Sequence, residues 1–189
     1  MPNFFSAFTT DVFRPLATLL IPGAIGVSTW FFALIWQFAS LQEFVVRNHT
    51  ETGFGLLLVM VFAGMVFEDF GARWENQLDR WADKRTEGQH TKNWLCYLQT
   101  SFKSDPVGRR YARALVLRLK FELGVGVASI SAAMGLIWLA TLGASCGILI
   151  SSFGVCLLFS CWGLIEAKET HKLLSRTRAT ILEKVRVME

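Results

Sequence analysis

Apolar residues along the chain gather in four runs, separated by polar segments that carry most of the charge. A helix needs about 20 mainly apolar residues to cross a bilayer. Three runs reach this length, whereas the second stops early at Glu68 and Asp69 and must extend past them. The pattern therefore predicts four transmembrane helices, at about 16–38, 53–70, 121–142 and 144–165.

The polar segment after the second run keeps a helical period. Phe70, Trp74, Leu78 and Trp81 are spaced by four, four and three residues, with polar residues between them. This spacing places the four side chains on one face of an amphipathic helix that is in register with the span before it. We expect this helix to leave the membrane unbroken.

A second long helix is predicted to lead back into the membrane. A break near 86–93 and a short apolar helix at 93–102 precede Asp105–Pro106, a typical helix start. The expected fold class is an all-α membrane protein, forming homo-oligomers. Its expected parts are an N-terminal transmembrane hairpin at 1–68, a cytoplasmic helical hairpin at 69–120, a second transmembrane hairpin at 121–165 and a cytoplasmic amphipathic helix at 166–189.

Composition and charge support this organisation and orient it. The chain is 52% hydrophobic, has a mean hydropathy of +0.39, and is 18% charged, against about a quarter in soluble domains. Of the 19 Lys and Arg residues, only Arg47 falls in a segment predicted to lie outside. Basic residues favour the cytoplasmic side of a membrane. Both termini and the segment 69–120 are therefore predicted to be cytoplasmic.

The C-terminal segment has apolar residues at seven-residue spacing, Leu174, Ile181 and Met188, among basic residues. Three interpretations fit this pattern: a coiled-coil oligomerisation stalk, a helix lying on anionic headgroups, and a helix docked on the cytoplasmic hairpin.

Small residues indicate close packing of the spans. Gly124, Ala128 and Ala132 are four residues apart on the third span, and such residues let helix backbones approach within one chain or between subunits. The pair Pro22 and Gly23 predicts a kink in the first span, with a gating hinge as the alternative.

Four carboxylates fall at the predicted cytoplasmic ends of spans: Glu68, Asp69, Glu122 and Glu166. Carboxylates near a membrane are costly and often mark ion paths. In a symmetric oligomer they would form an acidic ring at an inner mouth, which suits cations. The alternative is ion pairing with cations nearby in the sequence, namely Arg73, Arg118, Lys120 and Lys168.

Basic residues of the hairpin form a candidate ligand site: Arg85, Lys92, Arg109, Arg110, Arg113 and Arg118. Facing one another across the hairpin, they could hold a polyanion, with Tyr111 and Trp94 as stacking surfaces for bases. The alternative is simple anchoring on acidic lipid.

No catalytic residue, cofactor or metal site is predicted, because the common nucleotide-binding, hydrolase, metalloprotease and Cys-x-x-Cys motifs do not occur in the sequence. Arg85 and His90 match the spacing of the arginine–histidine motif of HEPN-type ribonucleases, but Gly88 lies between them in an expected turn. His49 and His171 have no partner at metal-ligand spacing. The four cysteines are interpreted as reduced structural thiols.

Three stretches, "RPLATLLIPGAIG", "EDFGARWE" and "RRYARALVLRLKFEL", together resemble the channel component of the Hailong anti-phage defence system, and the Kiwa membrane component is a poorer match. The resemblance covers most of 14–123. It implies an oligomeric channel in the bacterial inner membrane that DNA oligomers, made by a partner nucleotidyltransferase, hold shut. Loss of the oligomers would open the channel and depolarise the infected cell. The basic hairpin would be their binding place.

Two functions are therefore expected. The first is a homo-oligomeric channel in the lipid bilayer, expected to be a tetramer, gated through its cytoplasmic hairpin and tail. The second is a membrane-anchored scaffold or sensor without a conducting path. It would recruit a cytoplasmic partner through the aromatic residues Trp74, Trp81, Trp94 and Tyr97.

Overall fold

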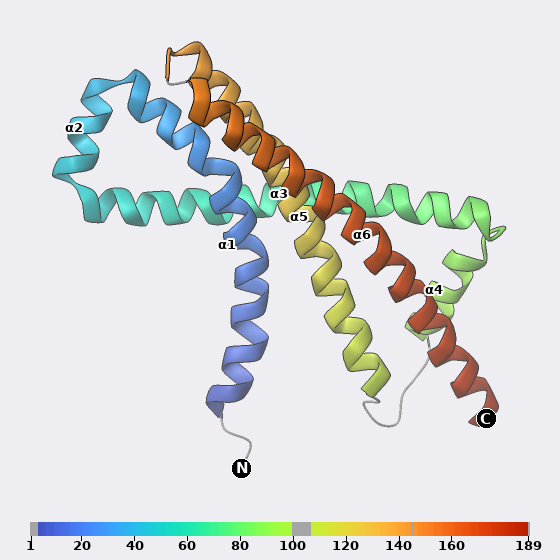
Figure 1. Ribbon diagram of the computed structural model, residues 1–189. Helices are drawn as coiled ribbons and strands as arrows, with labels where there is room; N and C mark the ends of the chain where they lie inside the picture. Colours follow the sequence, from blue (N-terminus) through green and yellow to red (C-terminus); the bar gives the residue numbers. More distant parts are fainter. Residues whose placement is uncertain (1–3, 100–106, 145, 189) are drawn as a thin grey trace.

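The computed structural model of the protein describes residues 4–99, 107–144 and 146–188, and all of its described secondary structure is helical. Its six helices are α1 (Phe4–Gln37), α2 (Ala39–Arg47), α3 (His49–Arg85), α4 (Gln89–Gln99), α5 (Val107–Thr141) and α6 (Cys146–Met188) (Figure 1). By length and composition, α1, α3, α5 and α6 can each cross a membrane, as the apolar pattern predicts. This indicates a multi-pass membrane protein.

Helix α5 is the centre of the bundle. In the most apolar 18-residue stretch of α5, 56% is buried inside the protein, whereas in that of α3 only 6% is buried. Helix α5 is therefore enclosed by its neighbours, and α3 is largely exposed. It packs against α6, α1 and α3. With α6 it forms an antiparallel hairpin whose tight turn contains Gly143 in the left-handed region, at φ 82°. Residues of α5 and α6 form the main core: Ala112, Leu115, Leu119 and Leu123 of α5 with Ala167 and Leu174 of α6.

Three helices continue without a break from an apolar run into a polar segment. Helix α3 has 37 residues and is about 55 Å long at 1.5 Å per residue, longer than the roughly 30 Å hydrocarbon core of a bilayer. It carries Glu68 and Asp69 in its middle, as expected. Helix α5 has 35 residues, and α6 has 43, joining the fourth apolar run to the C-terminal segment.

Glycines allow α1 and α3 to cross with their backbones in contact. A Cβ atom added to Gly64 of α3 would lie 2.0 Å from the carbonyl oxygen of Leu19, and one added to Gly23 would lie 1.7 Å from that of Met60. Pro22 is fully buried, and its Cγ would lie 3.2 Å from a Cβ added to Gly124 of α5. Pro22 and Gly23, the predicted hinge, thus lie where three helices meet. Helix α1 passes through this point as one helix that bends along its length (Figure 1).

The connection between α3 and α4 is shorter than the sequence analysis expected. Only 86–88 are non-helical, with Glu87 at φ 51° and Gly88 at φ 80°. Helix α4 can begin at Gln89 because side chains supply its first acceptors. The Asp83 carboxylate accepts the Thr91 backbone N–H at 2.9 Å and also the Thr91 hydroxyl. The expected helix start at 105–106 lies outside the described residues.

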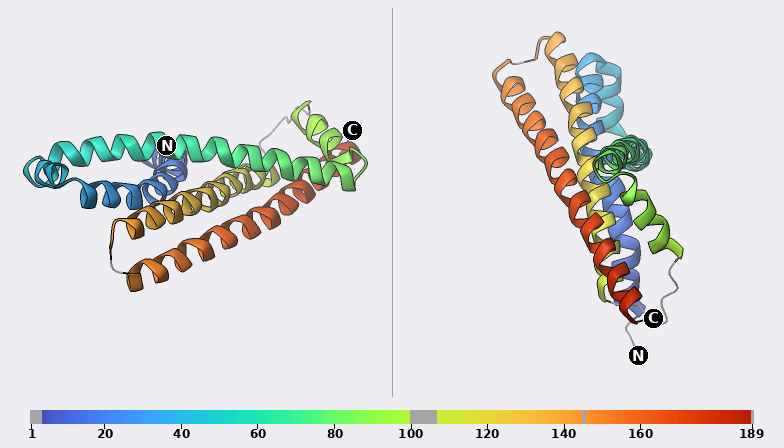
Figure 2. Two further views of the ribbon diagram at one scale, coloured as in Figure 1. Left: turned by 90° about the horizontal axis from the view of Figure 1, so that it is seen from above. Right: turned by 90° about the vertical axis from the view of Figure 1, so that its right-hand side faces the viewer.

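The polar segment after α3 contains a helix, α4, whose packing the sequence does not predict. Helix α4 packs mainly against α6 and the end of α3 rather than against α5. Helix α3 crosses α5 near Gly71, where an added Cβ would lie 3.2 Å from the Cβ of Leu123. Beyond this crossing the two helices run in different directions (Figure 1), and the right-hand view of Figure 2 shows α3 end-on where it passes α5. The C-terminal segment of α6 packs against α4 and α5 and meets the end of α3 through His171 and Asp79.

We predict that Gly64→Ala separates α1 from α3, because the added methyl group overlaps the Leu19 carbonyl. Overpacking of this kind costs about 1–3 kcal/mol, which thermal or denaturant unfolding in detergent would measure. Gly55→Ala is the matched control on the same helix, since nothing lies within 4 Å of its Cβ position. Equal stability of the two variants would show that the close crossing is not needed.

Candidate functional site

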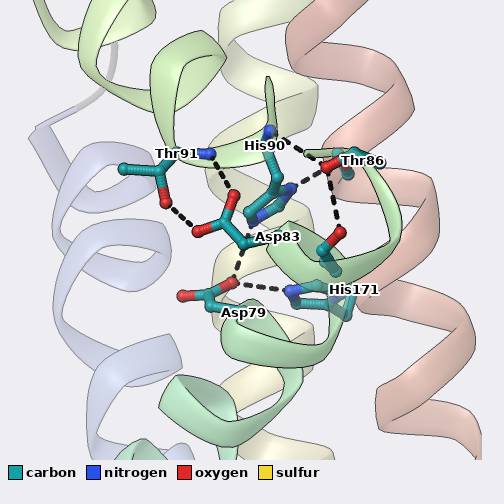
Figure 3. Close-up of polar contacts among 8 residues, drawn as sticks. Asp79, Asp83, Thr86, His90, Thr91 and His171 are labelled. Atoms are coloured by element: carbon teal, nitrogen blue, oxygen red, sulfur yellow. Dashed lines mark hydrogen bonds and ion pairs between the residues drawn. The ribbon is translucent and has the colours of Figure 1, made fainter. Parts of the chain in front are cut away.

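The polar ends of α3, α4 and α6 meet at a cluster of one carboxylate and two imidazoles, Asp79, His90 and His171, here called the three-helix junction (Figure 3). Asp79 Oδ1 lies 3.0 Å from His90 Nε2 and 2.7 Å from His171 Nε2, so one oxygen accepts from both rings. Both histidines are buried, with 8% and 6% of their surface exposed. The Asp79 side chain is 40% exposed, so the junction is open on one side.

The turn between α3 and α4 brings His90 back toward Asp79. Thr86, at the end of α3, accepts the His90 backbone N–H on its hydroxyl at 3.3 Å, and its own hydroxyl donates to the Ala82 carbonyl. On the far side of the ring, His90 Nδ1 lies 3.1 Å from the Ser175 hydroxyl of α6. The orientation of His90 is therefore fixed from all three helices.

The electrostatics of the junction favour an ionised Asp79. This residue lies eleven positions past Glu68, about 16 Å beyond the apolar run at 1.5 Å per residue. Burial opposes ionisation, but the hydrogen bonds from His171 and His90 outweigh it and hold the pKa of Asp79 below its ordinary value. Burial, and then the charge of Asp79, raise the pKa of the neighbouring Glu75.

The C-terminal part of α6 is docked on α3, α4 and α5. Arg178 is buried, its guanidinium lies 3.9 Å from the centre of the Trp94 ring, and burial lowers its pKa. Leu174 and Leu182 are also buried. Of the three interpretations of this segment, the structure shows the docked helix. Leu174, the first of the three residues at seven-residue spacing, is buried within the chain.

The four predicted carboxylates are each paired with a cation in this structure. Glu68 binds Lys120 at 2.6 Å, Asp69 binds Arg73 at 3.0 Å, and Arg118 binds both Glu122 at 2.6 Å and Glu166 at 3.0 Å. The Glu68–Lys120 bridge joins α3 to α5, and the Arg118–Glu166 bridge joins α5 to α6. The Arg118–Glu122 bridge lies within α5 and pairs the buried Glu122. We call Glu68, Lys120, Arg118, Glu122 and Glu166 the ion-pair belt.

Within the belt, Glu122 is the buried member. Its side chain is 5% exposed, and its Oε2 atom has no hydrogen-bond partner among the described residues. The belt thus matches the ion-pairing alternative within a single chain, and Lys168 is not needed for it. The buried carboxylate of Glu122 is stable only while Arg118 stays paired with it.

The predicted basic site is divided between two places. Arg110, Tyr111 and Arg113 are exposed on the first turns of α5. Arg85 and Lys92 are exposed beside the α3–α4 turn. Arg118 belongs to the ion-pair belt, and the side chain of Arg109 lies outside the described residues. These groups do not face one another, because α4 packs on α6 and α3.

The aromatic residues of the scaffold hypothesis are also divided. Trp74 and Trp81 are 44% and 45% exposed and line an open groove along α3, together with Phe70, Arg73 and Gln77. Trp94 instead stacks on Tyr97 with ring centres 6.0 Å apart and is covered by Arg178. Only the α3 groove is free for a partner in the described part of the chain.

Sequence reasoning missed the three-helix junction. In the sequence, His90 has only the spacing from Arg85 to mark it, and His171 has no partner at metal-ligand spacing. Their spacing along the chain gives no sign of their contact, which depends on docking of the tail. Comparison of the chain with protein-family models, curated proteins and solved structures found no match. Function must therefore be inferred from the geometry of the junction, the belt and the helices that join them.

We predict that Asp79→Ala loosens the docked part of α6, because two buried histidines lose their shared acceptor. Leaving a buried donor unsatisfied costs about 1–3 kcal/mol. Hydrogen–deuterium exchange should show faster exchange in 167–183 than in the wild type. Asp69→Ala is the control, since its pair with Arg73 is exposed and within one helix. Unchanged protection of 167–183 in Asp79→Ala would contradict a role of the junction in docking.

Proposed function

We propose that the protein is a homo-oligomeric ion channel of the bacterial inner membrane, gated from the cytoplasmic side by a nucleotide or oligonucleotide. Its opening would depolarise the cell as an anti-phage defence. The observation that carries this proposal is the continuity of α3, α5 and α6 from their apolar runs into polar ends. The polar ends of α3 and α6 meet at the three-helix junction. A ligand that moves those ends also moves the spans, because no flexible linker separates them.

The outer face of α6 supports assembly through several copies. Gly147, Ser151 and Gly154 lie on one exposed stripe of this helix, and nothing lies within 4 Å of a Cβ added to either glycine. Glycines in the interior of the bundle, such as Gly126 and Gly163, are by contrast in close contact with a neighbouring helix. In a membrane, a small-residue face permits the close approach of a second helix. We assign this face of α6 to the subunit contact.

The ion-pair belt gives the channel a closed state within each subunit. Glu68 of α3 is held by Lys120 of α5, and Glu166 of α6 by Arg118 of α5. A movement of α3 or α6 relative to α5 would break these bridges and turn carboxylates toward any path between subunits. Cation preference would then belong to the open state.

The ligand site in this proposal is the start of α5. Arg110 and Arg113 offer two exposed charges one turn apart, and Tyr111 offers a ring that is 48% exposed. This pairing of cations with an aromatic surface suits a phosphodiester chain with bases. The resemblance to the Hailong channel component supplies the class of ligand, a DNA oligomer made by a partner nucleotidyltransferase.

The second candidate function is a membrane-anchored scaffold without a conducting path. The groove lined by Trp74 and Trp81 favours it, because exposed aromatic side chains are typical of protein interfaces. The two functions differ in assembly. A single copy in detergent and in nanodiscs, counted by mass photometry or multi-angle light scattering, would favour the scaffold and oppose the channel.

We predict that the purified protein in planar bilayers gives discrete conductance steps that prefer cations. Glu68→Gln combined with Asp69→Asn should lower the cation-to-anion permeability ratio several-fold without changing the oligomer, because two negative charges leave the inner mouth. Glu51→Gln, at the other end of α3, is the control. Silent bilayers in the absence of any nucleotide would remove the channel proposal. Unchanged selectivity would leave these carboxylates with a structural role alone.

We also predict that Arg110→Glu with Arg113→Glu weakens binding of a short fluorescent oligodeoxynucleotide by at least about tenfold and flattens its salt dependence. Fluorescence anisotropy with the protein in nanodiscs would measure both. Arg85→Glu with Lys92→Glu removes the same charge at the α3–α4 turn and should have a smaller effect. If both pairs have the same effect, the binding is nonspecific and the assigned site is wrong.

A further inference from the structure

We propose that Asp79, His90 and His171 form a binding site for a zinc-class transition-metal dication, held by the Asp79 carboxylate and the Nε2 atoms of the two histidines. The three ligand atoms lie within 4.8 Å of one another and come from three different helices. The inference goes beyond the proposed conductance and does not depend on it.

The separations of the donor atoms are close to those of a coordination site. Zinc takes imidazole nitrogen and carboxylate oxygen at about 2.0–2.1 Å in tetrahedral geometry, which sets its ligand atoms roughly 3.3 Å apart. Asp79 Oδ1 lies 3.0 Å and 2.7 Å from the two Nε2 atoms. Each Nε2 atom has to move away from Asp79 Oδ1 by a few tenths of an ångström to admit the ion. The Asp79 side chain is 40% exposed, so water can reach the site as a fourth ligand.

The site can change from the hydrogen-bonded to the metal-bound arrangement without releasing a proton. In the hydrogen-bonded arrangement each neutral ring carries its proton on Nε2 and donates it to Asp79. In the metal-bound arrangement each ring carries the proton on Nδ1 and offers its Nε2 lone pair to the ion. For His90 this proton meets the Ser175 hydroxyl, 3.1 Å from Nδ1. An outer partner of this kind fixes the tautomer and orientation of metal-bound histidines.

The donor set selects the class of ion. Two imidazoles and one carboxylate suit zinc, cobalt or nickel, whereas magnesium and calcium prefer all-oxygen sites. The carboxyl groups of Glu75 and Asp83 on α3 interact electrostatically with Asp79, and the Arg178 guanidinium, placed over Trp94, adds an opposing positive charge. A bound dication would tie α6 to α3 and α4 more firmly than the hydrogen bonds do.

The test uses the full chain, without a polyhistidine tag, in nanodiscs and stripped with a chelator. Calorimetric titration with Zn²⁺ should give one ion per chain. His90→Ala and His171→Ala should each weaken binding by at least about tenfold, the loss that even outer-sphere changes can cause. His49→Ala, on the exposed first turn of α3, is the matched control and should bind as the wild type.

Both histidine ligands are buried, so replacing them could unfold the protein. A second measurement therefore uses the wild type. Titration with Co²⁺ should give the intense visible absorption of a four-coordinate nitrogen–oxygen site, and Zn²⁺ should abolish it. Hydrogen exchange in 167–183 should also slow when Zn²⁺ is added. Binding below one Zn²⁺ per chain, a Co²⁺ spectrum of the hydrated ion, or an equal loss in His49→Ala would each overturn the proposal.

Discussion

A backbone in hydrocarbon cannot leave its N–H and C=O groups unpaired, and this constraint governs the whole molecule. Each chain segment that enters the lipid must stay helical until it has left it. In this protein three of the four long helices stay helical far beyond that point. Each of these spans therefore forms one continuous helix with its polar end. A contact at one height along such a helix also fixes its position at other heights.

Contacts of three kinds hold these bodies together at successive levels. In the apolar part, the contact is between backbones, at the crossing of Gly23 and Gly64. At the border of the apolar runs, it is electrostatic, through the ion-pair belt centred on Arg118 and Lys120. Farther out it is the hydrogen bonding of the three-helix junction. Each kind suits its surroundings, because the strength of a charged contact depends on the nearby dielectric, whereas close packing does not.

Much of the fold could be predicted from the sequence, because periodicity and length are local properties. The apolar runs gave the four long helices, and the stripe from Phe70 to Trp81 gave the continuity of α3. For two of the four carboxylates the neighbours in sequence also gave the cation partner, since residues four apart on a helix lie close together. Arg73 with Asp69 and Arg118 with Glu122 are pairs of this kind.

The junction could not be predicted, because it depends on which face of the tail is buried and against what. The residues Leu174, Ile181 and Met188 fit a coiled coil as well as a docked helix, and their spacing cannot distinguish the two. His90 and His171 become neighbours only after α6 has docked and the three-residue turn has reversed the chain. Asp79 is one of the polar residues expected between the apolar positions of an amphipathic helix, so it gives no sign of the junction.

The position of Gly71 has a mechanical consequence for α3. This helix is held closely to α1 at Gly64 and to α5 at Gly71, and most of the rest of its apolar length touches little else in the chain. It is thus a lever with its fulcrum near the middle. Asp79 lies about 12 Å from Gly71 on one arm, and His49 lies about 33 Å away on the other, at 1.5 Å per residue. A rigid tilt about this point would move the far tip in the opposite direction and nearly three times as far.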